Sequence, residues 1–333
     1  MTTQPIAVLK PIMKPLVVKK LETWFLKHQR DLPWRQDQDP YKVWISETML
    51  QQTTSQAVIG YFQRFLKRFP SLKSLSESSI EEVYEMWAGL GYYSRARNLH
   101  KAAMELYKDG GFNNQSYKDL IKYPGFGPYT SRSLSSIAFE EPVGVLDGNV
   151  IRVLSRYHNF KAQWWKTTDK NKLQELSDQS VQGFSSRVIN QALMELGATI
   201  CTPTNPKCLI CPVSSSCKAF KAQTQEELPL KKPKKQHKLI YLNFYIYKQN
   251  NQLALEKNST SPFLKGQLLP PHDISEPAAK PKEFDFQHSI THYKIFVKIN
   301  KVKSKPQKTQ LYPIKDIKKL TPSSLVDKIL KNY

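Results

Sequence analysis

Residues 120–133 have the sequence Leu120-Ile121-Lys122-Tyr123-Pro124-Gly125-Phe126-Gly127-Pro128-Tyr129-Thr130-Ser131-Arg132-Ser133. Two glycines flank a phenylalanine, with a proline ahead of them and a helical pattern behind. Glycine permits backbone conformations and close approaches that a Cβ would block. We therefore expect a hairpin between two helices, with Gly125 and Gly127 at its tip. The N–H groups at the start of the second helix would suit a phosphate oxygen, although the pattern also fits an ordinary connection between helices.

The chain around this hairpin is helical up to about Phe220. Apolar side chains recur there at three- and four-residue steps, as an amphipathic helix requires. The expected helical stretches are Val58–Phe69, Ile80–Trp87, Ala96–Tyr107, Leu134–Phe139, Val150–Tyr157, Leu173–Val181 and Val188–Leu196. Pro and Gly pairs separate these stretches. The pattern predicts an all-helical domain over residues 1–222.

All cysteines of the chain lie in one short run downstream: Cys201, Cys208, Cys211 and Cys217. Thiolates this close together need a cation, so the run predicts a metal or iron–sulfur site. Zinc and a 4Fe-4S cluster fit the spacing equally well. The helix Ala192–Ile200 directly before the loop and the hairpin upstream favour the cluster. Lys207 inside the loop could meet a DNA phosphate, and we expect the metal to hold the loop without taking part in catalysis.

The composition changes after the cysteines. Residues 223–237 are rich in lysine and proline and are predicted to be a linker. Beyond it, Leu239–Tyr247 and Leu253–Leu255 are predicted strands, joined as a hairpin through Gln249-Asn250-Asn251. Tyr293–Ile299 alternates as a half-buried strand does, and Ser323–Leu330 is predicted to be a helix. Residues 238–333 thus form a small α+β domain.

The charge of the chain indicates its partner. Lys and Arg number 50 against 28 Asp and Glu, a formal charge of +22. A field this positive favours a polyanion, most often nucleic acid. No signal peptide or membrane-spanning stretch is recognisable, and clustered cysteines fit a reducing compartment. We expect a cytoplasmic protein that binds DNA and has no membrane partner.

Two carboxylates are candidates for acid–base chemistry. Asp147 lies in Leu146-Asp147-Gly148-Asn149 before a helix, where it would be an ordinary N-cap and would also stay ionised. Glu47 lies in the apolar stretch Val43–Leu50. A glutamate with apolar neighbours can have a raised pKa and act as a general acid, although most glutamates are simply solvated.

Residues 16–217 resemble the adenine DNA glycosylases of the MutY type. The resemblance rests on Leu32-Pro33-Trp34-Arg35, Pro40–Glu47, Met49–Thr53, Gly89–Leu99, Leu146–Val150 and the cysteine set. It implies a two-lobed helix–hairpin–helix glycosylase domain with a 4Fe-4S loop, related to endonuclease III. It also implies that the protein is a monomer that associates with the nucleoid of a bacterial-type cell. The protein would remove adenine mispaired with 8-oxoguanine or guanine in double-stranded DNA.

The resemblance assigns roles to individual residues. Glu47 would protonate the flipped adenine and Asp147 would stabilise the sugar cation, with Tyr129 and Asn149 supporting the pair. Residues that would wedge the duplex or contact DNA are Leu50, Gln51, Gln52, Leu90, Gly91 and Tyr92. Residues that would line the adenine pocket are Arg30, Leu32, Trp34, Arg35 and Gln191. For each of them, ordinary packing is the alternative interpretation.

One position separates the chain from endonuclease III-like lyases, which carry a lysine nucleophile just after the hairpin glycines. Tyr129 stands there and cannot form a Schiff base, so a monofunctional enzyme is expected. A bifunctional glycosylase/lyase and a non-catalytic iron–sulfur DNA-binding protein are the alternatives.

The resemblance extends to a Nudix-like fold for residues 238–333. In the family this domain has lost hydrolysis and senses 8-oxoguanine. The recognition loop of the family ends in Ser-His after an aromatic residue. Here Ile290-Thr291-His292 takes that place, which makes Thr291 and His292 the candidates for lesion recognition.

Overall fold

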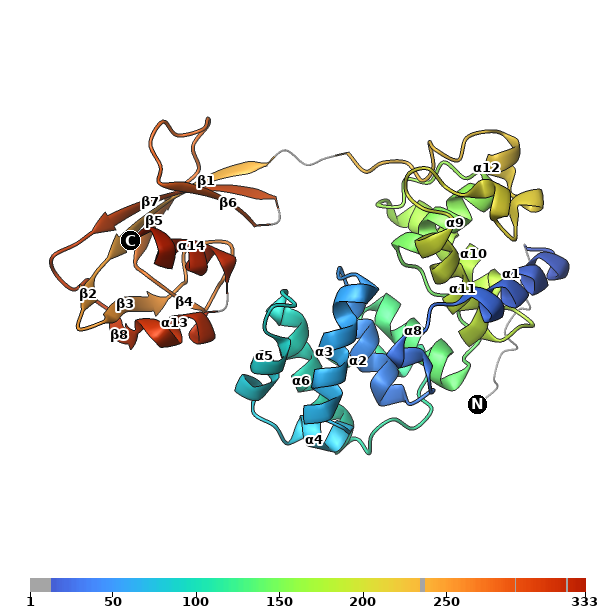
Figure 1. Ribbon diagram of the computed structural model, residues 1–333, viewed down its shortest axis with the longest axis horizontal. Coiled ribbons are helices and arrows are strands. Elements are labelled where there is room, and N and C mark those ends of the chain that lie inside the picture. Colours follow the sequence, from blue (N-terminus) through green and yellow to red (C-terminus); the bar gives the residue numbers. More distant parts are fainter. Residues whose placement is uncertain (1–12, 234–236, 291, 322) are drawn as a thin grey trace. The chain divides into compact units, whose positions relative to one another are not determined.

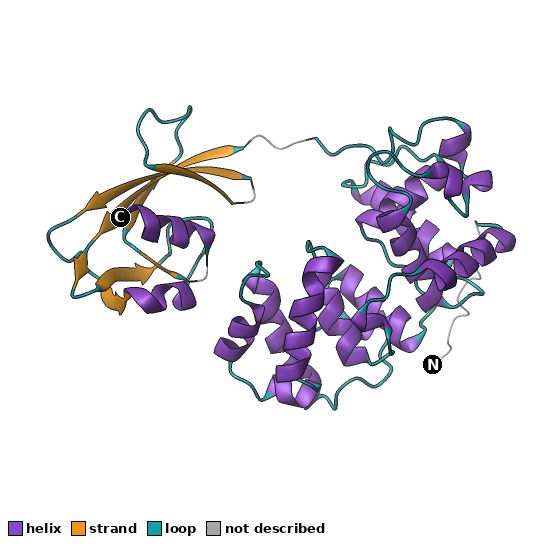
Figure 2. Cartoon of the chain, in the orientation of Figure 1, coloured by secondary structure: helices purple, strands orange, loops and turns teal. Residues whose placement is uncertain are grey.

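The computed structural model describes residues 13–233, 237–290, 292–321 and 323–333. The chain forms two compact units, Met1–Lys232 and Pro233–Tyr333. In the described residues the strands all lie in the second unit, while the first is helical (Figure 2). This confirms the predicted mainly helical fold with a small α+β domain. The described residues include no helix with the length and apolar character needed to span a membrane.

The first unit consists of helices joined by short connections. Its α-helices are α1 Pro15–His28, α2 Pro40–Leu50, α3 Ser55–Arg68, α4 Leu72–Ser76, α5 Ile80–Trp87, α6 Tyr93–Lys108, α7 Tyr117–Leu120, α8 Pro128–Phe139, α9 Gly148–His158, α10 Thr167–Ser180, α11 Ser186–Thr199 and α12 Lys218–Lys221. Three 3₁₀ turns accompany them: η1 Pro33–Arg35, η2 Cys208–Ile210 and η3 Ser214–Ser216.

These helices pack around two separate cores, and each core defines a lobe (Figure 1). Helices α2 to α8 enclose the first core, in which Trp44, Phe65 and Trp87 are fully buried. Helices α1, α9, α10 and α11 enclose the second, around Leu21 and Leu154. The two lobes predicted from the family resemblance are therefore present.

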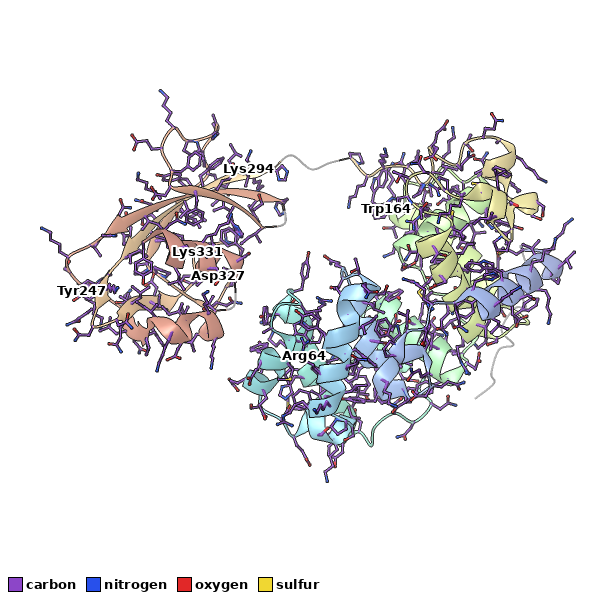
Figure 3. All side chains as sticks on the ribbon, in the orientation of Figure 1. Arg64, Trp164, Tyr247, Lys294, Asp327 and Lys331 are labelled. Atoms are coloured by element: carbon purple, nitrogen blue, oxygen red, sulfur yellow. The ribbon has the colours of Figure 1, made fainter. Side chains whose placement is uncertain are left out.

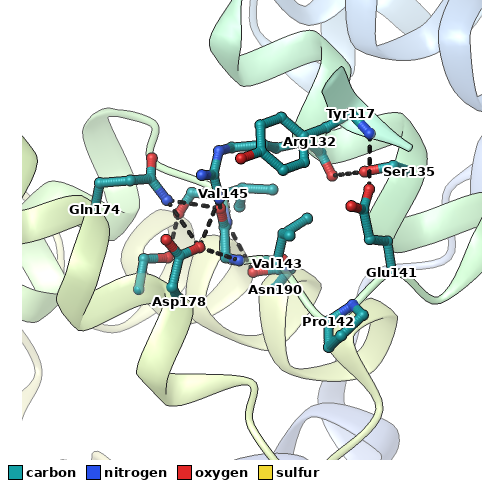
Figure 4. A network of polar contacts seen from close by, with 12 residues as sticks. Tyr117, Arg132, Ser135, Glu141, Pro142, Val143, Val145, Gln174, Asp178 and Asn190 are labelled. Atoms are coloured by element: carbon teal, nitrogen blue, oxygen red, sulfur yellow. Dashed lines mark hydrogen bonds and ion pairs between the residues drawn. The ribbon is translucent and has the colours of Figure 1, made fainter. Parts of the chain in front are cut away.

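The segment from the end of α8 to the start of α9 runs from one lobe to the other (Figure 4). Arg132 on α8 donates from Nη1 to Asp178 Oδ1 on α10 at 2.6 Å and to the Gly144 carbonyl at 3.2 Å. The Gly144 N–H donates to the same carboxylate oxygen at 2.8 Å. A Cβ on Gly144 would lie 2.2 Å from the Ser177 carbonyl carbon, so only glycine allows this approach. We call Arg132, Gly144 and Asp178 the interlobe clasp.

Part of the predicted linker packs on the helical unit. Leu228 is buried, and its carbonyl accepts a hydrogen bond from Arg156 Nε at 2.8 Å. Trp164, labelled in Figure 3, donates from its indole Nε1 to the Leu230 carbonyl at 3.1 Å. The helical unit thus continues to Lys232, whereas 222 was the expected boundary.

The second unit is built on two small sheets. Its strands are β1 Lys238–Ile246, β2 Lys248–Gln249, β3 Gln252–Lys257, β4 Leu268–Leu269, β5 His272–Ser275, β6 Phe286–Ile290, β7 Tyr293–Lys301 and β8 Gln310–Pro313. The first sheet has the order β5-β1-β7-β6, with β1 and β7 parallel. The second sheet joins β2, β3 and β4, with β8 also on β3. Helices α13 Ile314–Leu320 and α14 Ser324–Asn332 complete the core.

The predicted hairpin is present but uses a different strand. The turn Asn250-Asn251 has positive φ at both residues, as a type I′ turn requires, and it joins β2 to β3. The long strand β1 instead pairs with β7 over nine residues and with β5. Strand pairing between distant segments has no local signal, and β1 needs partners on both edges.

Candidate active site

A cavity of about 660 Å³ lies between the two lobes of the helical unit. It is lined by residues from both lobes, and twelve of them were predicted as site residues. They are Arg30, Leu32, Trp34, Arg35, Glu47, Leu50, Gln51, Gln52, Tyr129, Asp147, Asn149 and Gln191. These residues are separated by up to 161 positions in the chain, so the fold has gathered them.

Glu47 lies near the end of α2, a helix that Asp39 caps and that begins at Pro40. Its side chain is almost fully buried, and Oε2 accepts hydrogen bonds from Tyr129 at 2.6 Å and from Ser133 at 2.8 Å. Burial raises the pKa of Glu47, and the nearby charge of Asp147 adds to the rise. The two hydroxyls and Arg35 act in the opposite direction. The net raised pKa favours a protonated carboxyl, as a general acid requires.

Asp147 is the N-cap of α9, as its sequence context suggested. Oδ1 accepts from the Val150 N–H at 2.7 Å and Oδ2 from Asn149 Nδ2 at 2.8 Å. Burial raises the pKa of Asp147 as well, while the Val150 N–H and Asn149 oppose that rise. These donors fix the orientation of the Asp147 carboxylate in the lining of the cavity and stabilise its charged form.

Asn149 is itself held by Arg152, a residue the sequence did not point to. Arg152 Nη2 donates to Asn149 Oδ1 at 2.7 Å, and its Nε donates to the Cys201 carbonyl at 2.7 Å. Gly197 lies directly against Asn149, because a Cβ there would be 2.6 Å from the Asn149 Cβ. A chain of hydrogen bonds therefore connects Asp147, through Asn149 and Arg152, to the backbone of Cys201.

A buried carboxylate pairs with two arginines in the lining of the cavity. Glu195 on α11 has no exposed side-chain surface and pairs with Arg30 Nε at 2.7 Å and Arg35 Nη2 at 2.8 Å. Burial alone would raise the pKa of Glu195, but the two guanidinium groups outweigh it and the pKa is lowered. Sequence reasoning missed Glu195, although a glutamate in the apolar stretch Ala192–Leu196 was a usable signal. Leu32 and Trp34 are buried beside this cluster.

Two loops next to the cavity present the residues predicted to wedge the duplex. Gln52 and Tyr92 are exposed and both have positive φ. Arg95 joins their loops, since Nη1 donates to the Gln51 carbonyl at 2.6 Å and Nη2 to the Gly91 carbonyl at 3.3 Å. The Leu90 side chain, a candidate for DNA contact, is buried in the core of its lobe.

The glycine hairpin joins α7 to α8 as expected. Gly125 has φ +80°, and a Cβ there would lie 2.9 Å from the Asn98 Cβ. Both features require glycine. Gly127 has an ordinary φ of −80° and nothing within 4 Å of a Cβ position, so its backbone is open to a ligand rather than constrained by the fold.

The four cysteines line one small pocket behind α9. Arg156 Nη1 donates to Cys201 Sγ at 3.3 Å. Burial raises the pKa of Cys211 to about 12, so without a cation this thiol would stay protonated. As placed, no three His, Cys, Asp or Glu side chains of the described residues are close enough to hold a single ion. Lys207 is exposed on the loop.

Of the two lesion-recognition candidates, Thr291 falls outside the described residues, and His292 lies in a turn directly before β7. His292 is half-buried and its ring lies 4.1 Å from the Tyr293 ring.

Comparison with known proteins identifies the superfamily to which the helical unit is similar. Residues 45–181 match the HhH-GPD superfamily of base excision DNA repair proteins. The fold resembles that of a thermostable thymine-DNA glycosylase, at 28% identity and TM-score 0.57 over 62% of this chain and 96% of that one. It also resembles endonuclease III solved with DNA, at 19% identity and TM-score 0.51 over 63% of this chain and 96% of that one.

Relatives with similar sequences identify the family within this superfamily. The chain is 37% identical to an adenine DNA glycosylase of Buchnera aphidicola (strain Sg) over 72% of this chain and 69% of that protein. A second Buchnera protein of that name (strain Bp) is 35% identical over 81% and 80%. The human adenine DNA glycosylase is 42% identical, but the match spans 62% of this chain and only 40% of the human protein. The chain belongs to the adenine DNA glycosylase family.

Proposed function

We propose that this chain is a monofunctional DNA glycosylase that removes adenine mispaired with 8-oxoguanine or guanine from double-stranded DNA, acting as a monomer. The observation that carries this proposal is the pair of carboxylates in the interlobe cavity. They differ in environment: Glu47 is buried between hydroxyls, whereas Asp147 is held by an N–H and an amide. Two carboxyl groups with distinct environments suit separate acid and charge-stabilising roles.

The proposed mechanism uses these groups in sequence. A flipped adenine enters the cavity, and Glu47 gives its proton to a ring nitrogen, which makes the base a better leaving group. The glycosidic bond then breaks with its electron pair moving onto the base. Asp147 stabilises the positive charge that develops on the sugar until a water molecule adds to the sugar carbon and gives up a proton, as in sugar hydrolysis generally. Gln51, Gln52 and Tyr92 occupy positions next to the cavity from which they can fill the gap in the duplex.

The absence of a suitable amine supports a monofunctional enzyme. Among the described residues that line the cavity there is no lysine, and Tyr129 donates to Glu47 from the hairpin side. A Schiff base needs a primary amine, so the lining of this cavity supports a glycosylase without β-lyase activity.

One experiment tests the function. The purified chain is incubated with duplexes that hold adenine opposite 8-oxoguanine, guanine or thymine, and base release and strand cleavage are measured separately. We expect adenine release opposite 8-oxoguanine and guanine without borohydride-trapped protein. Glu47→Gln should bind the mispair and lose at least roughly 100-fold in rate. Trapped protein would indicate a lyase, and binding without base release would indicate a non-catalytic DNA-binding protein.

We also propose that Cys201, Cys208, Cys211 and Cys217 hold a 4Fe-4S cluster. All four thiols line one pocket. Their spacing suits zinc as well as a 4Fe-4S cluster, and the family resemblance together with the helix directly before the loop favours the cluster. The cluster would hold the loop that carries Lys207.

The colour of the protein tests this cofactor. The purified chain should be brown and contain iron and sulfide, while a zinc protein would be colourless. Cys208→Ser replaces a thiolate with a poor ligand, and we expect loss of visible absorption together with weaker DNA binding. Full DNA affinity in colourless protein would show that the loop is dispensable.

A further inference from the structure

Ser133 is a buried hydroxyl at the catalytic acid to which sequence reasoning gave no role. It lies on α8 four residues after Tyr129, so both side chains are on the same face of the helix. Ser133 has no exposed surface, and its Oγ is 2.8 Å from Glu47 Oε2. The Tyr129 hydroxyl lies 2.6 Å from the same oxygen.

The two oxygens of Glu47 are therefore unequal. Oε2 receives two hydroxyl groups, and each hydroxyl has a single proton to donate. Oε1 accepts no hydrogen bond from the described residues, and Glu47 lines the cavity. A proton placed on Oε2 would need an acceptor, so one hydroxyl would have to turn away. Besides Glu47, the Tyr129 hydroxyl has two partners within reach: the Met194 sulfur at 3.4 Å, which is a weak acceptor, and the Ser133 hydroxyl.

We propose that Ser133 is a positioning residue that, together with Tyr129, places the proton of Glu47 on Oε1, the oxygen open to the base. This inference rests on the proposed function and extends it to a residue outside the set that contacts substrate. With Ser133 present, both lone-pair positions of Oε2 are occupied by donors. Without it, Oε2 regains a free position, and the proton divides between the two oxygens.

The pH dependence of the single-turnover rate tests the proposal. A hydrogen bond to the ionised carboxylate lowers its pKa, so its loss in Ser133→Ala raises that pKa. A general acid works while protonated, and the alkaline limb of the profile should move up by about one pH unit. The rate on the acid side should fall by about 2-fold or more, because the proton is now shared. Ser133→Thr keeps the hydroxyl and should restore the wild-type limb.

A matched control separates this role from packing. Ser135 is equally buried on the same helix, but its hydroxyl donates to the Arg132 carbonyl at 3.3 Å and does not contact Glu47. Ser135→Ala should keep the wild-type pH profile even where its melting temperature falls. An unmoved alkaline limb in folded Ser133→Ala would overturn the proposal. Absence of base release by the wild-type chain would overturn the proposed function instead, so the two failures are distinguishable.

Discussion

The ionised form of Glu47 destabilises the folded chain. The side chain is buried, and burial together with the charge of Asp147 raises its pKa. The folded chain therefore binds the proton of the Glu47 carboxyl more tightly than the unfolded chain does. In the unfolded chain the pKa of a glutamate is about 4.3. The native state is consequently stabilised below about pH 4.3 and loses that stability as the pH rises through the folded-state pKa.

We expect Glu47→Gln to be more stable than the wild type at neutral pH. Glutamine keeps the shape and avoids the buried charge, so the melting temperature at pH 7.5 should rise by about 3 °C. The difference should shrink toward pH 4.3, where Glu47 is protonated in both states. Thermal unfolding from pH 4 to 8 measures this dependence.

Glu82 provides the control for this comparison. It is half-buried, with a side chain that is 39% exposed, and hydrogen bonds from the Ser79 backbone N–H and Arg68 lower its pKa. Glu82→Gln should therefore not stabilise the chain at pH 7.5. Equal melting temperatures of Glu47→Gln and the wild type across the whole range would show that Glu47 titrates normally.

Helix α8 connects the acid to the rest of the site. One face carries Tyr129 and Ser133 against Glu47, and Arg132 points to the other lobe through the interlobe clasp (Figure 4). Beyond the clasp, the Val145 carbonyl accepts from Ser177 at 2.5 Å. Asp147 follows two residues later. The clasp therefore sets where α9 and its capping carboxylate begin relative to Glu47.

Breaking the clasp should slow catalysis more than it weakens binding. Arg132→Met leaves the partly buried Asp178 without its ion-pair partner and should cost about 2 kcal/mol of stability. Because Asp147 is displaced relative to Glu47, we expect the single-turnover rate to fall roughly 10-fold or more. Stopped-time excision assays and binding titrations on one duplex separate the two effects.

The pair Arg187–Glu140 is the matched control for the clasp. Arg187 Nη2 lies 2.6 Å from Glu140 Oε1, and the pair joins the end of α8 to α11. In the described residues, neither side chain hydrogen-bonds to the residues directly before Asp147. Arg187→Met should cost stability but leave the excision rate near that of the wild type. Equal slowing in both variants would mean that the clasp contributes only to general stability.

At the scale of the whole molecule, the chain combines a catalytic helical unit with a basic α+β unit. The net charge of the whole chain is +22, which favours DNA as its partner. We propose the Nudix-like assignment of this unit from the family resemblance, and lesion sensing from Ile290-Thr291-His292. His292 lies in a tight turn between paired strands, where a recognition side chain can be held in place.

Removing the proposed recognition pair should change mispair preference. Thr291→Ala with His292→Ala deletes a hydroxyl and an imidazole that can hydrogen-bond a purine edge. Lost base-edge contacts cost about 1–3 kcal/mol, or roughly 5- to 150-fold. We expect slower excision opposite 8-oxoguanine and little change opposite guanine, measured side by side. Ile290→Ala should matter less. Equal slowing on both duplexes would locate lesion sensing elsewhere.

Local features of the fold were predictable because their causes are local. The predicted helix Ile80–Trp87 has the same bounds in the structure, since Ser79 and Glu82 form a capping box and Val83 and Trp87 face the core. Asp147 was recognisable as a cap for the same reason. The partners of β1 were not predictable, because nothing in the strand itself specifies pairing with a segment more than 50 residues away.

By itself the sequence determined the order of motifs, the helical character up to the cysteines, the single ligand set and the family resemblance. Only the tertiary structure decided which side chains share the cavity and which, like Leu90, are buried in the core. Glu195 meets Arg30 across 165 positions, and Ser133 meets Glu47 across 86. Contacts over such separations arise from the packing of helices that are distant from each other in the chain. No window of the sequence contains both partners, so their chemistry appears only when the chain is folded.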